Sequence, residues 1–147
     1  MSTHTTTAVA HWSGDLAGIG TIESSSIRSD ISVPKNLSGR GVGTNTEDLL
    51  VSAAATCFSI TAGYALTTNN LPFDGLLVRS TGHLELERGL RLAKIVHEVD
   101  VVAHVSPTSQ QQEAILRVVA GIEKSCLVSR AMAGNVDIVI NARVSAG

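Results

Sequence analysis

The chain has 147 residues, of which 44% are hydrophobic, 16% charged and 3% aromatic, and its formal net charge is -2. A chain of this length and apolar content can bury a core of its own, so we expect residues 1–147 to form a single domain. The small negative charge argues against nucleic acid or an anionic membrane as a partner, and the scarcity of aromatic residues excludes a base-stacking platform.

Three short strands are predicted near the N-terminus, over residues 8–14, 21–25 and 27–33. Residues 35–43 are rich in glycine and serine, which indicates a mobile loop. The first residues are polar and lack the apolar core of a signal peptide. No run comes near the roughly 18 apolar residues that a membrane span needs. We therefore expect a cytoplasmic protein with no membrane partner.

The strongest helix signal begins at Asn45, which can cap a helix. Glu47 and Asp48 place negative charge in the first turn, where the helix dipole favours it. Residues 49–66 are apolar and rich in alanine, and the pattern stops at an Asn-Asn pair. Because this helix is apolar almost all round, we expect it to be central and buried.

Two long strands follow, over residues 76–87 and 94–105, and Arg88-Gly89 fits a hairpin turn between them. Both strands alternate between apolar and polar residues, which is typical of half-solvated antiparallel strands. A second helix is predicted from Thr108 or Ser109 to Lys124.

The helical phase shifts at Ser125-Cys126, so that a short helical segment is expected over residues 127–132, and a final strand over residues 136–144. The order is β-β-β-α-β-β-α-β, with hairpins rather than βαβ crossovers. It predicts an α+β fold with antiparallel sheets.

Cys57 and Cys126 are the only cysteines and the leading candidates for chemistry. In a reducing cytoplasm a cysteine pair is more often catalytic, redox-active or metal-binding than a structural disulfide. The alternative is that both are inert core residues, since free cysteine is commonly buried. Cys57 is predicted to lie in mid-helix, so a cation from elsewhere would have to lower its pKa. The residues expected to share its stripe are Leu50, Ala53, Ala54, Ile60 and Tyr64.

No metal site and no bound cofactor are predicted. The five histidines are scattered, and none has a partner at the spacing of a zinc site. By alternation, His83 and His104 should face solvent while His97 shares the apolar face of its strand. No phosphate-binding glycine loop, dinucleotide fingerprint or G-x-S-x-G elbow is present.

The cysteine-bearing segments resemble the OsmC/Ohr family, the osmotically inducible and organic hydroperoxide resistance proteins. Residues 43–50, Gly-Thr-Asn-Thr-Glu-Asp-Leu-Leu, with the later Ala-Thr-Cys-Phe at 55–58, are similar to the family's G-T-N-P-E-x-L…A-x-C-F signature. Residues 123–129, Glu-Lys-Ser-Cys-Leu-Val-Ser, are similar to its C-P-x-S motif. Thr46 and Leu127 stand where the family has proline. The opening at 10–15 and the loop at 33–37 are also similar to family members.

The resemblance implies a thiol-dependent peroxidase that reduces organic hydroperoxides, of alkyl or fatty-acid type. It implies an intertwined homodimer, with antiparallel sheets wrapped around long central helices and active sites at the subunit interface. By this resemblance Cys57 is the peroxidatic thiol, oxidised to a sulfenic acid, and Cys126 is the resolving thiol. A dithiol reductant such as a lipoyl group would then regenerate the enzyme.

The resemblance also implies a glutamate, Glu47, that orients an arginine beside the thiolate. Arg40 is our first choice for that arginine because it is close in sequence to Glu47; Arg28 and Arg130 are the alternatives. Glu47 and Cys57 are ten residues apart, about 15 Å along a helix axis, so one straight helix cannot place both in a compact site. If Glu47 takes part, the site is expected to be shared between two subunits; otherwise Glu47 only complements the helix dipole.

Two rivals to the peroxidase remain open. One is a non-catalytic, stress-associated dimer that binds apolar ligands and whose thiols are structural. The other is a redox sensor whose thiols are oxidised without turnover.

Overall fold

The computed structural model describes residues 1–103 and 105–147 of the chain. His104, which the alternation pattern predicts to face solvent, lies outside the described residues. The chain divides into two compact units, Met1–Leu49 and Leu50–Gly147. Each unit is described by itself.

The N-terminal unit is built on a three-stranded sheet of β1 (Val9–Ser13), β2 (Ile19–Glu23) and β3 (Arg28–Ile31), in that order and antiparallel. All three predicted strands are confirmed within a few residues of their ends. The glycine-rich segment after β3 contains a 3₁₀ turn, η1 (Lys35–Leu37). It returns to the sheet at Thr44, whose N–H donates to the Asp30 carbonyl over 2.9 Å. Gly43 has a φ of 68°, and a Cβ there would collide with the same carbonyl, so this return requires glycine.

The long helix α1 (Thr46–Thr68) begins where the sequence predicts. The Asn45 side-chain oxygen accepts a hydrogen bond from the Asp48 N–H over 2.9 Å, which caps the first turn. The helix ends before Asn70, which adopts a left-handed φ of 52°. Both predicted ends of the helix are therefore confirmed.

The second sheet consists of β4 (Gly75–Glu85), β5 (Arg91–Ala103) and β6 (Asp137–Ala146), with β5 in the middle. β4 and β5 form the predicted antiparallel hairpin, and Gly89 in its turn has a φ of 105°. β6 pairs with β5 in parallel, so the prediction of hairpins alone is wrong for this connection. A parallel neighbour needs a crossover, and the helical segment between β5 and β6 supplies it.

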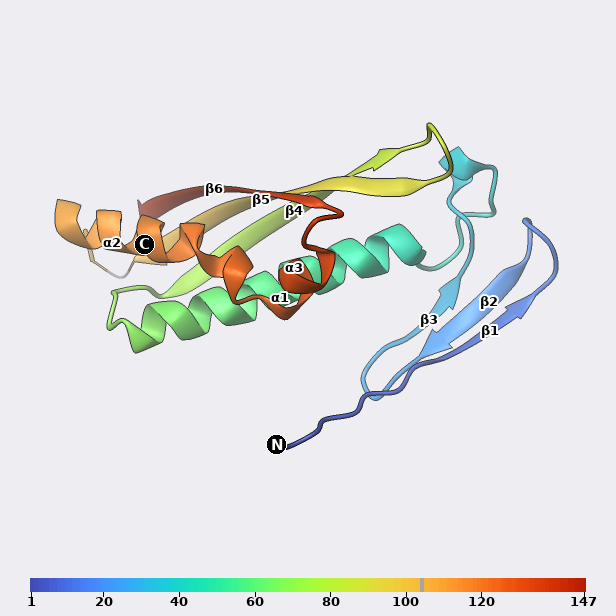
Figure 1. Ribbon diagram of the computed structural model, residues 1–147, viewed down its shortest axis with the longest axis horizontal. Coiled ribbons are helices and arrows are strands. Elements are labelled where there is room, and N and C mark those ends of the chain that lie inside the picture. The colour runs from blue at the N-terminus through green and yellow to red at the C-terminus, as the bar shows by residue number, and fades with distance from the viewer. Residues whose placement is uncertain (104) are drawn as a thin grey trace. The chain divides into compact units, whose positions relative to one another are not determined.

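The crossover runs through α2 (Ser109–Ala120), the 3₁₀ turn η2 (Ile122–Lys124) and α3 (Leu127–Met132). Thr108 caps α2 in a capping box with Gln111, as one of the two predicted caps. The break at Cys126 and the short helix after it are also confirmed. The helices α1, α2 and α3 lie against one face of the β4–β5–β6 sheet (Figure 1). The predicted α+β class, with two sheets and a long helix, is confirmed.

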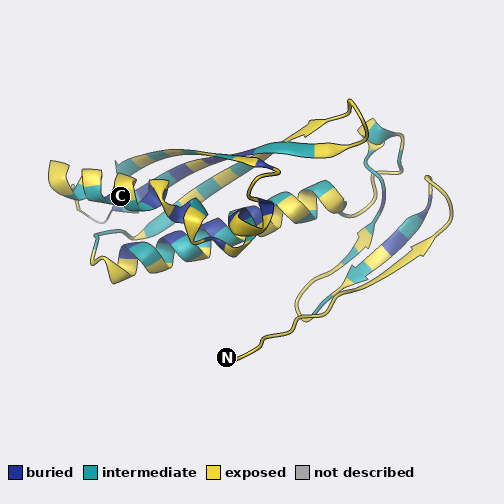
Figure 2. Ribbon diagram, viewed as in Figure 1, coloured by how far each residue is buried: buried dark blue, intermediate teal, exposed yellow. Residues whose placement is uncertain are grey.

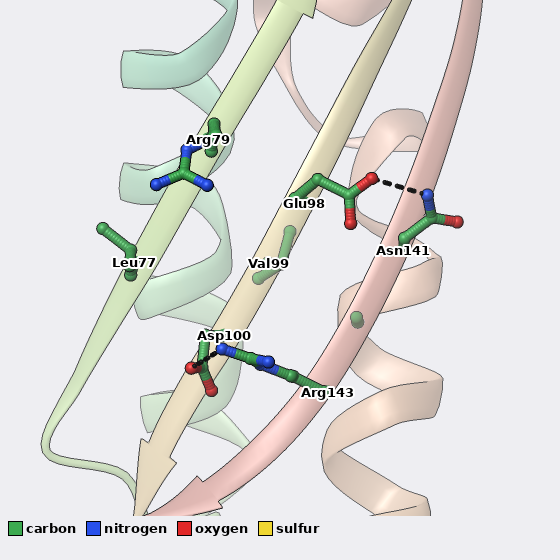
Figure 3. Close-up of a pocket in the computed structure, with 8 residues that line it drawn as sticks. Leu77, Arg79, Glu98, Val99, Asp100, Asn141 and Arg143 are labelled. Carbon is green, nitrogen blue, oxygen red and sulfur yellow. Dashed lines mark hydrogen bonds and ion pairs between the residues drawn. The ribbon is translucent and has the colours of Figure 1, made fainter.

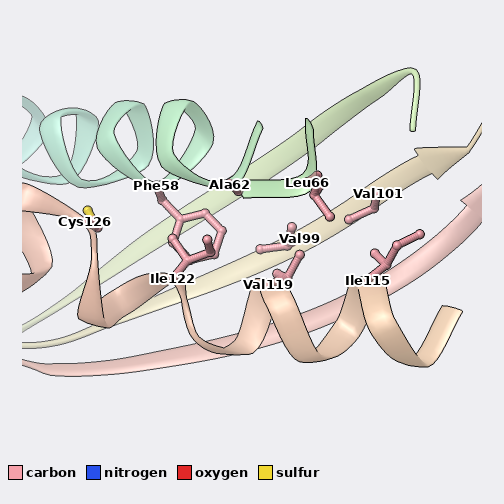
Figure 4. Packing of buried hydrophobic residues seen from close by; sticks show 9 residues of the cluster. All are labelled: Phe58, Ala62, Leu66, Val99, Val101, Ile115, Val119, Ile122 and Cys126. Atoms are coloured by element: carbon pink, nitrogen blue, oxygen red, sulfur yellow. The ribbon is translucent and has the colours of Figure 1, made fainter. Parts of the chain in front are cut away.

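The core of the second unit lies between these helices and the inward face of the sheet (Figure 4). β5 contributes its alternate residues Ile95, His97, Val99, Val101 and Ala103, all buried. The core members from the helical segments are Phe58, Ala62, Leu66, Ile115, Val119, Ile122 and Cys126. As predicted, His97 shares the apolar face.

The buried stripe of α1 differs from the predicted one. The buried residues are Ala54, Phe58, Ala62 and Leu66, spaced by four, whereas Ile60 and Tyr64 are 69% and 72% exposed. Buried and exposed residues alternate along the helix in Figure 2. The expectation of an all-round buried helix is therefore wrong for the isolated chain. Because nearly every position is apolar, the sequence does not reveal which side faces the sheet.

α1 is also long and apolar enough to cross a membrane by length and composition alone, with a mean hydropathy of 1.6 over 18 residues. The prediction that no such run exists is therefore wrong, because the serine, threonine and glycine residues between the apolar ones lower the mean hydropathy only slightly. One stripe of this helix packs on the sheet, as in the core helix of a globular unit.

Candidate thiol site

The two cysteines meet in the second unit. Cys57 lies in the middle of α1, partly buried, and Cys126 immediately precedes α3 and is fully buried. Cys126 belongs to the core cluster and Cys57 packs against that cluster. The Cys126 side chain points toward α1 (Figure 4), and its thiol donates a hydrogen bond to the Cys57 sulfur. Both cysteines are free in this structure.

The start of α3 also contacts the Cys57 sulfur. The backbone N–H groups of Val128 and Leu127 donate to it. These are the first N–H groups of a helix, which have no partner within the helix and carry partial positive charge. The helix start after Cys126 predicts backbone N–H groups near the Cys126 sulfur, and the Ser129 N–H does lie there. The Leu127 and Val128 N–H groups contact the Cys57 sulfur instead. The expectation that only a cation can lower the Cys57 pKa is therefore wrong.

The pKa values of the two thiols move in opposite directions. Burial raises the pKa of Cys57, but hydrogen bonds from Cys126, the Val128 N–H, Thr61 and the Leu127 N–H together outweigh burial and lower the pKa. The Thr61 hydroxyl lies 4.0 Å from the sulfur.

For Cys126 the balance is reversed. Burial raises its pKa first, and the hydrogen bond it gives to Cys57 raises the pKa further, while Ser129 lowers it in part. Cys57 is therefore the thiol more easily ionised and Cys126 the thiol that keeps its proton.

The candidate arginines are all exposed, and they fall in different units. Arg40 and Arg28 belong to the N-terminal unit, and Arg130 lies on α3 of the second unit. Among the described residues, no ion pair joins Arg40 to Glu47. Glu47 lies in the first turn of α1, as the dipole argument expects. The roles of these residues stay predictions.

A buried histidine, His97, lies beneath α1, and nothing in the sequence around it indicates a role. The Nδ1 atom of His97 is 2.6 Å from the Ser80 hydroxyl, its pairing neighbour on β4. Its ring lies 4.6 Å from that of Phe58, the residue after Cys57. Burial lowers the His97 pKa, so the imidazole is neutral at pH 7. The one sequence feature that could have pointed to His97 is a polar residue at an inward position of β5.

The outward face of the second sheet is polar and hollowed (Figure 3). A depression of about 420 Å³ is lined by Arg79, Glu98, Asp100, Asn141 and Arg143, among others. Arg143 pairs with Asp100 over 2.8 Å, and Asn141 donates to Glu98 over 2.9 Å. These four side chains therefore satisfy one another's charged and polar groups. The cysteines lie on the opposite face of the sheet. Within residues 1–103 and 105–147, no group of three or more His, Cys, Asp or Glu residues is placed to hold a metal ion.

Comparison with known proteins identifies the family. The family model described as OsmC-like protein matches residues 39–141. The uncharacterized protein YmaD of Bacillus subtilis (strain 168) is 33% identical over 148 residues, which cover 100% of this chain and 99% of that protein.

Solved structures share the fold. An organic hydroperoxide resistance protein OsmC from Legionella pneumophila gives a TM-score of 0.80 at 24% identity, over 98% of this chain and 100% of that one. The organic hydroperoxide resistance protein OhrB of Bacillus subtilis gives 0.69 at 22% identity, over 93% and 98%. The family match, which includes both cysteines, shows that this chain belongs to the OsmC-like protein family.

Proposed function

We propose that this protein is a thiol-dependent peroxidase that reduces organic hydroperoxides, with Cys57 as the peroxidatic thiol and Cys126 as the resolving thiol. The observation that carries the proposal is the hydrogen-bonded thiol pair with opposite pKa shifts. A peroxidatic cysteine must be a thiolate, and a resolving cysteine must be near it yet protonated until needed. Inert core cysteines would not require this asymmetry.

In the proposed reaction the Cys57 thiolate attacks the distal oxygen of the hydroperoxide. The O–O bond breaks, the alkoxide takes a proton and leaves as an alcohol, and Cys57 becomes a sulfenic acid. Cys126 then attacks the Cys57 sulfur, which forms a disulfide and releases water. A dithiol reductant, such as a lipoyl group in a cytoplasmic setting, is oxidised to return both thiols.

The proposed active form is a homodimer. Positions 50, 53, 57, 60 and 64 fall on one side of α1 at 100° per residue, with the three- and four-residue spacing of a helix–helix seam. Leu50, Ile60 and Tyr64 on this side are exposed in the single chain, at 38%, 69% and 72%. A second copy would cover them and place Cys57 at the interface. It would also allow Glu47 of one subunit, with Arg40, to serve Cys57 of the other.

Apolar side chains near Cys57 favour alkyl or fatty-acid hydroperoxides in this proposal. Leu50 and Ile60 share the exposed side of α1 with Cys57, and Val128 is partly buried beside the core. Phe58 is fully buried against the sheet, so it does not line the exposed side of α1. Its side chain packs between α1 and the sheet instead.

The test is turnover of tert-butyl hydroperoxide with a dithiol reductant. Cys57→Ser should abolish turnover, because a serine hydroxyl does not ionise at neutral pH, while the circular dichroism spectrum is retained. Ser52→Ala, at an exposed hydroxyl of the same helix, is the matched control and should keep full activity. Full activity in folded Cys57→Ser would refute the proposal.

One observation favours the non-catalytic rival: Cys126 is fully buried among apolar side chains, as structural cysteines commonly are. Titration of thiols before and after one equivalent of tert-butyl hydroperoxide separates the candidates. Loss of two thiols per chain, restored by a dithiol, supports the peroxidase. Inert thiols support the rival, and oxidation without a catalytic cycle supports the redox sensor.

A further inference from the structure

Two buried polar atoms in the second unit, His97 Nε2 and Ser129 Oγ, take part in none of the hydrogen bonds described so far. Beyond the Cys126 thiol, which the Ser129 hydroxyl approaches, neither atom has a hydrogen-bond partner in the part of the chain that the structure describes. His97 is fully buried and Ser129 is 4% exposed. Unpartnered buried polar atoms are costly, so two of them in one core call for an explanation.

The two residues occupy matching places in the core. On β5, His97 stands between Ile95 and Val99, which belong to different core clusters. On the helical side, Ser129 stands one turn after Cys126 and one turn before Met132. Val99 and Cys126 share one cluster, whereas Ile95 and Met132 share the other. His97 and Ser129 therefore face the same junction between the two clusters.

The thiol beside them has a proton to lose. Cys126 is fully buried, and its pKa is raised, so it does not ionise readily at neutral pH. When Cys57 ionises, the Cys126 thiol donates a hydrogen bond to the Cys57 thiolate. Once Cys57 is a sulfenic acid, that acceptor is gone, and Cys126 must still become a thiolate to attack.

We propose, resting on the function proposed above, that Ser129 and His97 form a buried proton relay that activates the resolving thiol Cys126. In this relay the Ser129 hydroxyl accepts the Cys126 proton and passes its own, through a bridging water molecule, to His97 Nε2. The relay uses the tautomer in which the Nδ1–H of His97 donates to the Ser80 hydroxyl, 2.6 Å away, because that tautomer leaves Nε2 as the base. Ser129 then donates to the new Cys126 thiolate.

The step balances. The Cys126 thiolate forms the S–S bond with Cys57 as the S–O bond breaks, and the hydroxide that leaves takes up one proton to become water. When His97 releases the proton it received, the sum is sulfenic acid plus thiol giving disulfide plus water. The proposed role of His97 and Ser129 is to carry the proton of Cys126 away from its sulfur.

The surroundings of His97 suit a base. The core cluster that contains Phe58, the ring neighbour of His97, holds two titratable side chains, the thiols of Cys126 and Cys57. β4 contributes Ser80, and β6 contributes Ile140 as the neighbour in register. The exposed Arg130 of α3 and the acids of β5 point elsewhere. The lowered pKa leaves the imidazole neutral, and thus able to accept a proton, at pH 7.

The experiment follows disulfide formation in a single turnover with tert-butyl hydroperoxide as a function of pH, and follows Cys57 oxidation separately with a sulfenic-acid trap. In the unaltered chain the resolution rate should be nearly flat with pH around neutrality. In His97→Phe it should be at least about tenfold slower at pH 7, since general bases typically contribute 10²–10⁴-fold. It should also rise about tenfold per pH unit toward the thiol pKa.

Ser129→Ala tests the relay without removing the imidazole and should show the same slow, pH-dependent resolution, even if His97→Phe does not fold. His83→Gln, an exposed histidine on β4, is the matched control and should behave as the unaltered chain. Wild-type rates and a flat pH profile in Ser129→Ala or in folded His97→Phe would overturn the relay while leaving the peroxidase intact. Failure of Cys57 to oxidise in the unaltered chain would overturn the proposed function, and the relay with it.

Discussion

At the scale of residues, identical thiols acquire different chemistry from their neighbours. Cys57 receives hydrogen bonds from a thiol, a hydroxyl and two backbone N–H groups, whereas Cys126 gives one away and is fully buried. The sequence could single out both cysteines, because they are the only two and stand in recognisable segments. It could not show that the first turn of α3 reaches Cys57, since that contact joins residues about 70 positions apart and depends on the packing of α3 against α1.

A first prediction concerns this asymmetry. Cys126→Ala removes the hydrogen bond that stabilises the Cys57 thiolate, so the Cys57 pKa should rise. The measurement is the pH dependence of Cys57 alkylation by iodoacetamide, whose midpoint should move to higher pH. Ser125→Ala, at the exposed neighbouring position, should leave the midpoint unchanged. A midpoint that stays in place or falls in Cys126→Ala would contradict the assigned hydrogen bond.

At the scale of elements, helix ends were predictable and helix faces were not. Asn45 and Thr108 are local caps whose side chains bond within three residues, so sequence alone locates them. The phase of α1 is set by packing on the sheet, and an almost uniformly apolar helix hides it. The parallel pairing of β6 likewise depends on where the crossover through α2 and α3 returns, which alternation within β6 does not encode.

A second prediction belongs to α1. Ile60→Lys places a charge in the exposed seam that a second copy is proposed to cover, so it should convert a dimer into monomers. Size-exclusion chromatography with light scattering is the measurement. Leu77→Lys, on the outward face of β4 and 59% exposed, is the matched control and should remain dimeric. A dimer that tolerates Ile60→Lys as well as Leu77→Lys would rule out this seam.

At the scale of the whole molecule, the histidine buried in the core links stability to pH. Burial lowers the pKa of His97 below its ordinary value of 6.5, so the unfolded chain binds the extra proton more readily than the folded one. This stability is present above pH 6.5 and is lost as the pH falls through the lowered folded-state pKa. The sequence could predict that His97 points inward, but not the hydrogen bond to Ser80 or the contact with Phe58.

A third prediction follows from that linkage. The free energy of unfolding should fall as the pH drops below 6.5, with a contribution from His97 of at most about 1.4 kcal/mol per pH unit. Urea denaturation across pH 5 to 8 is the measurement, and His97→Phe should flatten the dependence. His83→Gln should retain it. An equally steep loss of stability in folded His97→Phe would assign the dependence to other groups.

The central claim is that Cys57 and Cys126 form one redox pair driven by an organic hydroperoxide. Its most direct test is intact-mass and peptide mapping of the protein after one equivalent of tert-butyl hydroperoxide, with no reductant present. The account predicts the loss of two hydrogens per chain and a single cross-linked peptide that contains both cysteines. A chain that keeps both thiols free, or that joins Cys57 to anything other than Cys126, would contradict it.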